Sequence, residues 1–215
     1  MFQKTLLTIT AAALTMLLSG CGETDQKSEN SAGDVTYGDT RDKRYYTNFL
    51  KTDLPLEGVS YVCNTQGTPE TKVTTDTGAM VCGAYEAARL YFSNIYLGQI
   101  SFQSDNAVIT PDYFNNSHQV AENDKAINMV TLINSIADIS ASGQYRKLSN
   151  THFQTLYNSD IELSDPTFIA NVEHATGVTM LTKLEAVTIM NTILSGTSIV
   201  YSLNSRHEAI RTDNN

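Results

Sequence analysis

Apolar residues are distributed unevenly along the chain and divide it into four stretches. An apolar run, interrupted only by threonines, covers Leu6–Leu18, and a strongly polar stretch extends from there to residue 44. From residue 45 to 112 the apolar residues come in short segments, and from 113 to 215 they recur at helical spacing. This order predicts an α+β fold, in which an antiparallel β region with one disulfide precedes a small helical region.

The β region contains five short segments that are rich in Val, Ile, Tyr, Phe and Thr. Turn-forming sequences such as Asp76-Thr77-Gly78 and Ser93-Asn94 separate them, which is typical of antiparallel strands joined by tight turns. Alternation within the segments is imperfect, so the pattern does not say which side chains face the core. The predicted strands are Gly58–Cys63, Val73–Thr75, Ala79–Cys82, Arg89–Ser93 and Ile95–Ile100.

The second half of the chain shows four segments with apolar residues at helical spacing. Two of them have clear end signals: Asp165-Pro166 predicts an N-cap followed by the first helical residue, and Thr182 with Glu185 fits a capping box. The predicted helices are 123–141, which Asn123 or Asp124 caps, Asn150–Tyr157, Asp165 to a stop at Gly177, and Thr182 to Gly196; Ser198–Leu203 is predicted as a final strand.

The N-terminal 20 residues have the composition of a signal peptide. Lys4 supplies a positive charge, and the 13-residue apolar stretch Leu6–Leu18 is too short to cross a bilayer core, which requires about 20 residues. The run ends in Leu18-Ser19-Gly20-Cys21, which resembles the lipobox of bacterial lipoproteins. The alternatives are an ordinary secretory signal with a chance cysteine and a buried apolar helix.

The lipobox resemblance implies that Cys21 receives a diacylglyceryl group and becomes the first residue of the mature protein. Two or three acyl chains, palmitate among them, would then anchor the chain stably in a membrane. Because Gly22 stands where an inner-membrane retention signal would have Asp, we expect the outer membrane.

Residues 21–44 are predicted to form a lipidated, flexible tether, because they contain too little apolar surface to offset the entropy of ordering. An acidic interaction tail is the alternative. Cleavage before Cys21 removes one Lys and shifts the net charge from −9 to −10. Since acidic proteins are repelled by anionic lipid, we expect the domain to stand away from the membrane. The same charge argues against nucleic acid as a partner.

Cys63 and Cys82 remain once Cys21 is used for lipid. Export would bring them into an oxidising compartment, and they lie 19 residues apart across an apparent hairpin, so we predict a disulfide. Two free buried thiols are the alternative. Zinc sites normally recruit four ligands, so no metal site is predicted for two cysteines alone.

Residues 54–112 resemble a small cystine-bearing β module of proteobacterial envelope and surface lipoproteins. The resemblance rests on Gly58-Val59-Ser60-Tyr61-Val62-Cys63, Thr75-Asp76-Thr77-Gly78-Ala79-Met80-Val81-Cys82, Leu90-Tyr91-Phe92 and Leu97-Gly98. Met80 replaces the usual aromatic residue. The module implies an Asp-Gly hairpin turn and a pairing of its two cysteines, but no assigned activity.

Candidate catalytic residues are few. Asp76-Thr77-Gly78-Ala79 matches the string of aspartic proteases, in which two aspartates share a proton and activate water, so a single copy would require a homodimer. An ordinary turn is the alternative. The four histidines are scattered without metal-ligand spacing, and no nucleophile elbow, phosphate loop or dinucleotide fingerprint is present. Those histidines are His118, His152, His174 and His207.

The sequence therefore predicts a lipid-anchored, non-enzymatic envelope lipoprotein that acts as a binding or structural module, without cofactor or metal. An envelope protein is the expected partner, with the membrane reached through Cys21. An accessory lipoprotein of a secretion or pilus assembly, which would grip a partner through the helical half, is one alternative. A hydrolase that uses Asp76 is the other.

Overall fold

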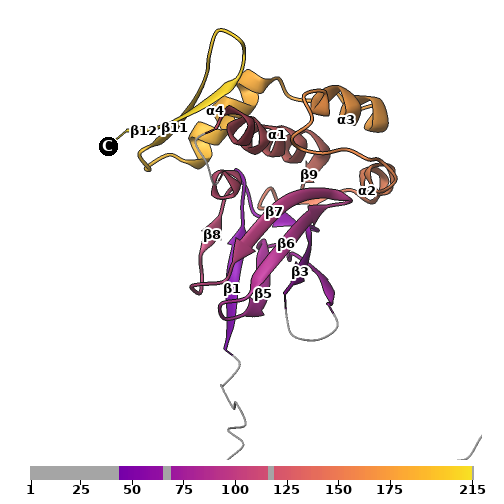
Figure 1. Ribbon diagram of the computed structural model, residues 1–215. Coiled ribbons are helices and arrows are strands. Elements are labelled where there is room, and N and C mark those ends of the chain that lie inside the picture. The colour runs from indigo at the N-terminus through magenta and orange to yellow at the C-terminus, as the bar shows by residue number, and fades with distance from the viewer. Residues whose placement is uncertain (1–43, 65–68, 116–118, 215) are drawn as a thin grey trace, which may run out of the picture. The chain divides into compact units, whose positions relative to one another are not determined.

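The computed structural model of the chain describes residues 44–64, 69–115 and 119–214 (Figure 1). These residues form an α+β fold, as the sequence pattern predicts. The strands between residues 45 and 109 lie together, and the helices α1 to α4 lie on one side of them, beside the C-terminal strand hairpin (Figure 1). The predictions for residues 1–43, including lipidation of Cys21 and the tether, lie outside the described residues.

The first sheet places the N-terminal strand in its centre. Strand β1 (Tyr45–Leu50) pairs antiparallel with β5 (Ala79–Gly83) and parallel with β8 (Val108–Ile109). One face of this sheet is buried, and it consists of Asn48, Leu50, Met80, Cys82 and Ile109.

The second sheet has four strands in the order β4-β3-β6-β7, all antiparallel. Their bounds are Thr71–Val73 for β4, Ser60–Cys63 for β3, Ala87–Phe92 for β6 and Ile95–Ser101 for β7. Strands β6 and β7 form a hairpin whose turn is Ser93-Asn94, where Ser93 adopts a positive φ of 58°. Positive φ at a central turn residue matches the right-handed twist of the two strands.

The remaining elements follow a 3-10 helix at Pro111–Phe114. The long helix α1 (Val120–Ile136) packs against α4, and a two-stranded hairpin closes the chain. The other bounds are Leu56–Glu57 for β2, Ala137–Ile139 for β9, Arg146–Leu148 for β10, Asn150–Tyr157 for α2, Phe168–Thr176 for α3, Lys183–Ile193 for α4, Ile199–Leu203 for β11 and Ala209–Asp213 for β12. Strand β10 pairs with both β2 and β9.

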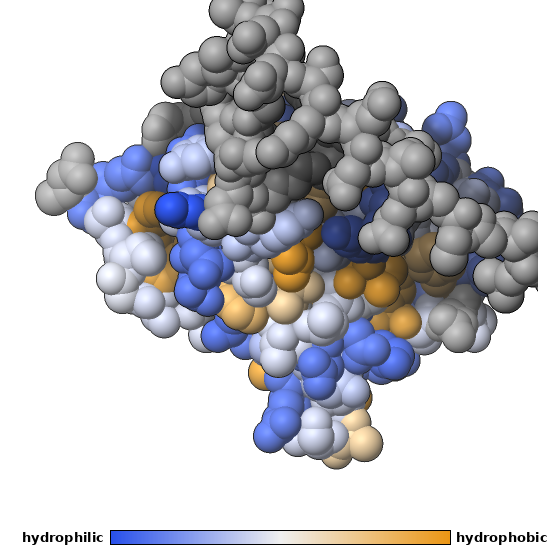
Figure 2. Space-filling model, turned by 90° about the horizontal axis from the view of Figure 1, so that it is seen from below, coloured by the Kyte–Doolittle hydropathy of each residue, from blue (hydrophilic) through white to orange (hydrophobic). Residues whose placement is uncertain are grey.

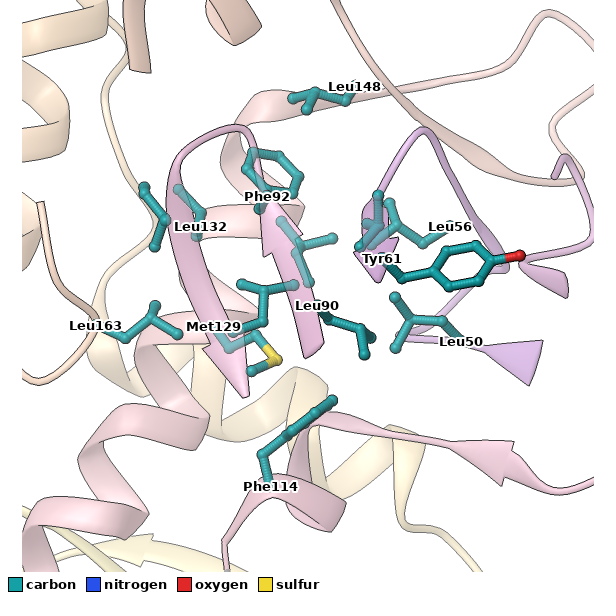
Figure 3. Close-up of a cluster of buried hydrophobic side chains, with 14 of the residues drawn as sticks. Leu50, Leu56, Tyr61, Leu90, Phe92, Phe114, Met129, Leu132, Leu148 and Leu163 are labelled. Carbon is teal, nitrogen blue, oxygen red and sulfur yellow. The ribbon is translucent and has the colours of Figure 1, made fainter. Parts of the chain in front are cut away.

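The main hydrophobic core draws on both halves of the chain (Figure 3). Leu50, Leu90 and Phe92 from the sheets lie in the same buried cluster as Met129 and Leu132 of α1. A second, smaller cluster fills the space between α1, α4 and the hairpin β11–β12. Helix α1 contributes to both clusters and therefore connects them.

Three of the four predicted helices need corrected bounds, and the reasons differ. Helix α1 begins at Val120, after a Gln119 that provides no side-chain cap, so Asn123 and Asp124 are not its cap. It ends at Ile136, because the chain then becomes extended and pairs as β9. The capping box of Thr182 is confirmed, although the helix ends three residues before Gly196.

Helix α3 begins at Phe168 rather than at Pro166. The carboxylate of Asp165 accepts hydrogen bonds from the backbone N–H and the hydroxyl of Thr167, each at 2.7 Å. These bonds fix a turn ahead of the helix, which is the local alternative that Asp side chains offer the backbone. The predicted stop is confirmed, since Gly177 adopts the left-handed conformation with φ of 69°.

The predicted strand Val73–Thr75 is displaced by two residues, because Thr71–Val73 forms the ladder with β3. Thr74 is instead buried, and its hydroxyl donates to the Leu56 carbonyl at 2.6 Å and accepts from the Val59 N–H at 3.0 Å. The backbone of Thr74 still pairs, since its N–H donates to the Val59 carbonyl at 2.9 Å and its carbonyl accepts from the Gly58 N–H at 3.1 Å, and the hydroxyl adds two further bonds outside the regular ladder. The strand Ser198–Leu203 is confirmed as β11, which starts one residue later.

Candidate functional site

The predicted disulfide is confirmed. Cys63 of β3 and Cys82 of β5 are bonded, with their Cα atoms 5.7 Å apart. Both are buried, with exposed fractions of 5% and 1%. Because β3 and β5 belong to different sheets, the bond ties the two sheets together across the main core.

A carboxylate lies beside this disulfide. The possible ligand atoms of Cys63, Cys82 and Glu86 fall within 4.8 Å of one another. However, metal ligation by cysteine requires thiolates, and here the two sulfurs are bonded to each other. The Glu86 carboxylate accepts a hydrogen bond from the Gly83 N–H at 2.9 Å, so it stabilises the turn after β5.

Asp76 lies at the exposed apex of the turn between β4 and β5. The N–H of Gly78 donates to the carbonyl of Thr75 at 2.8 Å, which closes the turn. Gly78 has φ of 74°, and a Cβ there would collide with the backbone of Leu50, whose N–H donates to the Gly78 carbonyl. Gly78 is therefore required by close packing of the turn against β1.

The described histidines lie apart in the structure. His152 is half-buried in α2, and its Nδ1 atom is buried without a hydrogen-bond partner. His174 is exposed in the last turn of α3, and His207 is exposed in the turn between β11 and β12 with φ of 60°. His118 lies outside the described residues.

A groove of about 920 Å³ lies in the helical half. Its walls come from the N-terminal part of α1, the segment that leads into α3, the start of α4 and the turn of the hairpin β11–β12. Leu163 and Phe168 are buried beneath it, whereas Val120 and Ile169 offer partly exposed apolar surface. The groove thus combines an apolar base with an open rim.

Carboxylates predominate over cations at the rim of this groove. Lys183 donates to Asp124 at 2.7 Å and to the His207 carbonyl at 3.0 Å, which fixes the hairpin turn against α1 and α4. The other carboxylates that line the groove are Asp165, Glu173 and Glu208. Burial is partial for all of them, and a cationic ligand would meet a net negative field here.

A largely buried polar network holds the hairpin β11–β12 in place. The hydroxyl of Tyr201 donates to Asp112 at 2.8 Å and accepts from the side-chain amide of Asn115 at 2.9 Å. The Arg211 guanidinium donates to the same Asp112 carboxylate at 2.8 Å. Burial, together with the hydrogen bond to Asp112, raises the pKa of Tyr201 well above its usual range. The Tyr201 phenol therefore stays neutral and donates to Asp112. The network fixes the position of the hairpin.

The groove could not be located by sequence motif. Its residues come from four segments that are up to 88 positions apart, from Val120 to Glu208. One local signal existed: in Asp160–Asp165, acidic or polar residues alternate with the apolar Ile161 and Leu163. This alternation indicates an extended segment with one buried side and one acidic side, and the structure has both.

Within the described residues, none of the helices is both long enough and apolar enough to cross a bilayer. Comparison with known proteins gives no assignment: no family model, no curated protein and no solved structure matches the chain.

Proposed function

We propose that this chain is an exported, lipid-anchored envelope protein whose folded domain binds a partner outside the cytoplasm. The observation that carries the proposal is the buried disulfide between Cys63 and Cys82. Structural disulfides persist in oxidising compartments and are rare in the cytosol. The disulfide therefore supports export independently of the signal-peptide pattern and the Cys21 lipobox, on which the anchor itself rests.

Lipidation is tested by replacing the sulfur of Cys21. We expect the native chain to incorporate radioactive palmitate and to fractionate with outer membranes, and the Cys21→Ser chain to lose both properties. The matched control is Cys82→Ser, which leaves Cys21 intact and should keep the palmitate label. Unchanged labelling and distribution of the Cys21→Ser chain would overturn the anchor.

The groove supports a binding role for the domain. Its base offers apolar surface at Val120 and Ile169, and its rim carries four carboxylates against the one lysine, Lys183. Such a site fits an extended or helical peptide segment that presents an apolar side chain next to basic ones. We therefore propose an envelope protein with a basic amphipathic segment as the partner.

Crosslinking in intact cells tests this binding role. A photoreactive amino acid at Ile169, inside the groove, should yield one crosslinked partner in fixed ratio. The same amino acid at Tyr157, which is 56% exposed on α2, serves as the control and should not. A single stoichiometric partner would favour an accessory role in a larger envelope machine, whereas equal yields from both positions would refute the groove.

A further inference from the structure

The outward face of the first sheet is unusual because it is mostly apolar although part of it is exposed. Residues paired across a ladder share a face, and the register pairs Thr47 with Val81, Phe49 with Ala79 and Phe49 with Val108. The outer face of β5-β1-β8 therefore consists of Tyr45, Thr47, Phe49, Ala79, Val81, Gly83 and Val108. We call this set the outer sheet face.

This face carries no charged side chain, although antiparallel sheets normally turn polar residues toward water. Tyr45 is 59% exposed, Val108 57% and Val81 37%. Figure 2 views the molecule from the side on which β1 begins, and apolar residues there form several orange areas among the hydrophilic ones. Tyr45, Val81 and Val108 lie on one face of one sheet, and exposed apolar side chains gathered in this way are typical of an interaction site.

Two further aromatic side chains lie at the end of the sheet where β1 begins, but Tyr46 pairs with Cys82 and so belongs to the face opposite the outer sheet face. The rings of Tyr46 and Tyr85 meet edge to face, with centroids 6.1 Å apart. Tyr85 is 78% exposed and adopts φ of 67°, a conformation that is strained for a bulky side chain. The N–H of Tyr85 donates to the Phe102 carbonyl at 2.7 Å, so the turn is fixed and the ring is presented to solvent. Within the outer sheet face itself the exposed tyrosine is Tyr45, and tyrosine is a residue type that favours the boundary between lipid and water.

We infer that the outer sheet face docks onto the phospholipid surface of the membrane that holds the Cys21 acyl chains; this inference rests on the proposed lipid anchor. Tyr45 is both the first residue of β1 and a member of the face, and it lies only 24 positions after Cys21. Fully extended, that stretch spans at most about 85 Å. The covalent link thus keeps the face at high local concentration near lipid, where weak apolar contacts suffice.

The charge of the outer sheet face differs from that of the chain as a whole, and this difference decides how the face should behave near lipid. The chain is acidic overall, with a net charge of −9, which predicts repulsion from anionic lipid. Several of its acids, among them Asp124, Asp165, Glu173 and Glu208, surround the groove of the helical half. The outer sheet face itself is uncharged, so a zwitterionic phosphatidylcholine surface is the matching probe.

The test uses the absence of tryptophan from the chain, which makes a single introduced indole an unambiguous reporter. The full lipidated protein carrying Tyr45→Trp is incorporated into phosphatidylcholine vesicles with or without brominated acyl chains, which quench indoles at the bilayer surface. The control is Tyr157→Trp on α2, in the helical layer. We expect loss of emission on brominated lipid for position 45 only.

A second variant separates contact from mere proximity. Adding Val81→Glu places a charge on the outer sheet face and should abolish quenching at position 45, whereas Val200→Glu on β11, at 40% exposure, should not. Retention of the disulfide by mass and an unchanged circular dichroism spectrum establish that each variant is folded.

Failure of the anchor and failure of docking give different results. A purified chain without acyl mass on Cys21 would overturn the anchor and, with it, this inference. An acylated chain whose position 45 is not quenched would overturn the docking alone. Sedimentation that shows a dimer, together with absence of quenching, would assign the face to a second copy of the chain instead.

Discussion

Reduction of the Cys63–Cys82 disulfide should destabilise the fold by an amount set by the loop that it closes. The bond joins residues 19 positions apart, and it connects two sheets that share one core. In the chain-entropy description, a loop of this size corresponds to a loss of about 3 kcal/mol in the free energy of unfolding. For a domain of 150–250 residues, that loss lowers Tm by roughly 6–12 °C.

The measurement is urea-induced unfolding followed by circular dichroism, on native protein with and without a thiol reductant. The midpoint should fall on reduction. The variant Cys63→Ala with Cys82→Ala should show an equal or larger loss, because two buried sulfurs are also removed from the core. This variant is the control for the reductant itself, since its midpoint should not respond to added thiol.

Two results would contradict this reasoning. One is a native protein whose midpoint is unchanged after complete reduction, which would mean that the fold holds the two sheets together without the bond. The other is a double-alanine variant that still responds to reductant, since the effect would then have another origin. Mass spectrometry of alkylated thiols confirms that reduction is complete in each case.

Three further predictions concern single residues. Asp53→Asn removes a bidentate contact with Arg146, at 2.8 and 2.7 Å, and should cost about 1–3 kcal/mol at neutral pH. Burial opposes ionisation of Asp53, but hydrogen bonds and charge from Arg146 outweigh it and hold the pKa of the carboxyl below its usual value. The stability from this pair is thus complete above the unfolded pKa near 4, and it is lost as pH falls through the lower folded pKa. The free energy of unfolding should therefore depend less on pH in the acid range for the variant than for the native protein. Identical pH profiles of the two proteins would refute this expectation. Thr182→Ala removes the capping box and should cost about 1 kcal/mol in urea unfolding, whereas no change would show that the cap is dispensable. Gly98→Ala would drive a methyl group into the Phe114 ring and should lower stability by about 1–3 kcal/mol; a Tm equal to that of the native protein would contradict this steric argument.

Much of the fold could be predicted because local signals were strong. Helix α2 has the predicted bounds, the capping box begins α4, and Gly177 ends α3. The two cysteines and the compartment implied by the signal peptide were enough for the disulfide. These features depend on neighbouring residues or on redox chemistry, so they can be predicted from the sequence without knowledge of the tertiary structure.

Other features depend on distant partners and had no local signal. Strands β2, β8 and β10 have two or three residues each, and pairing with another segment defines them. The sequence of β1 does not predict a strand, because Asn48 is buried and the outward positions are mostly apolar. The usual alternation of apolar and polar residues is therefore missing. The Asp112–Arg211 ion pair joins residues 99 positions apart and is equally invisible in the sequence.

The central place of β1 determines how the domain would respond to mechanical load. Any tension applied to the polypeptide ahead of Arg44 reaches the fold through Tyr45. Because β1 lies between β5 and β8, a pull along the strand must shear hydrogen bonds on both sides together instead of peeling an edge one bond at a time. The disulfide then transfers that force from β5 to β3. The domain should thus resist mechanical unfolding when it is pulled from its N-terminal side.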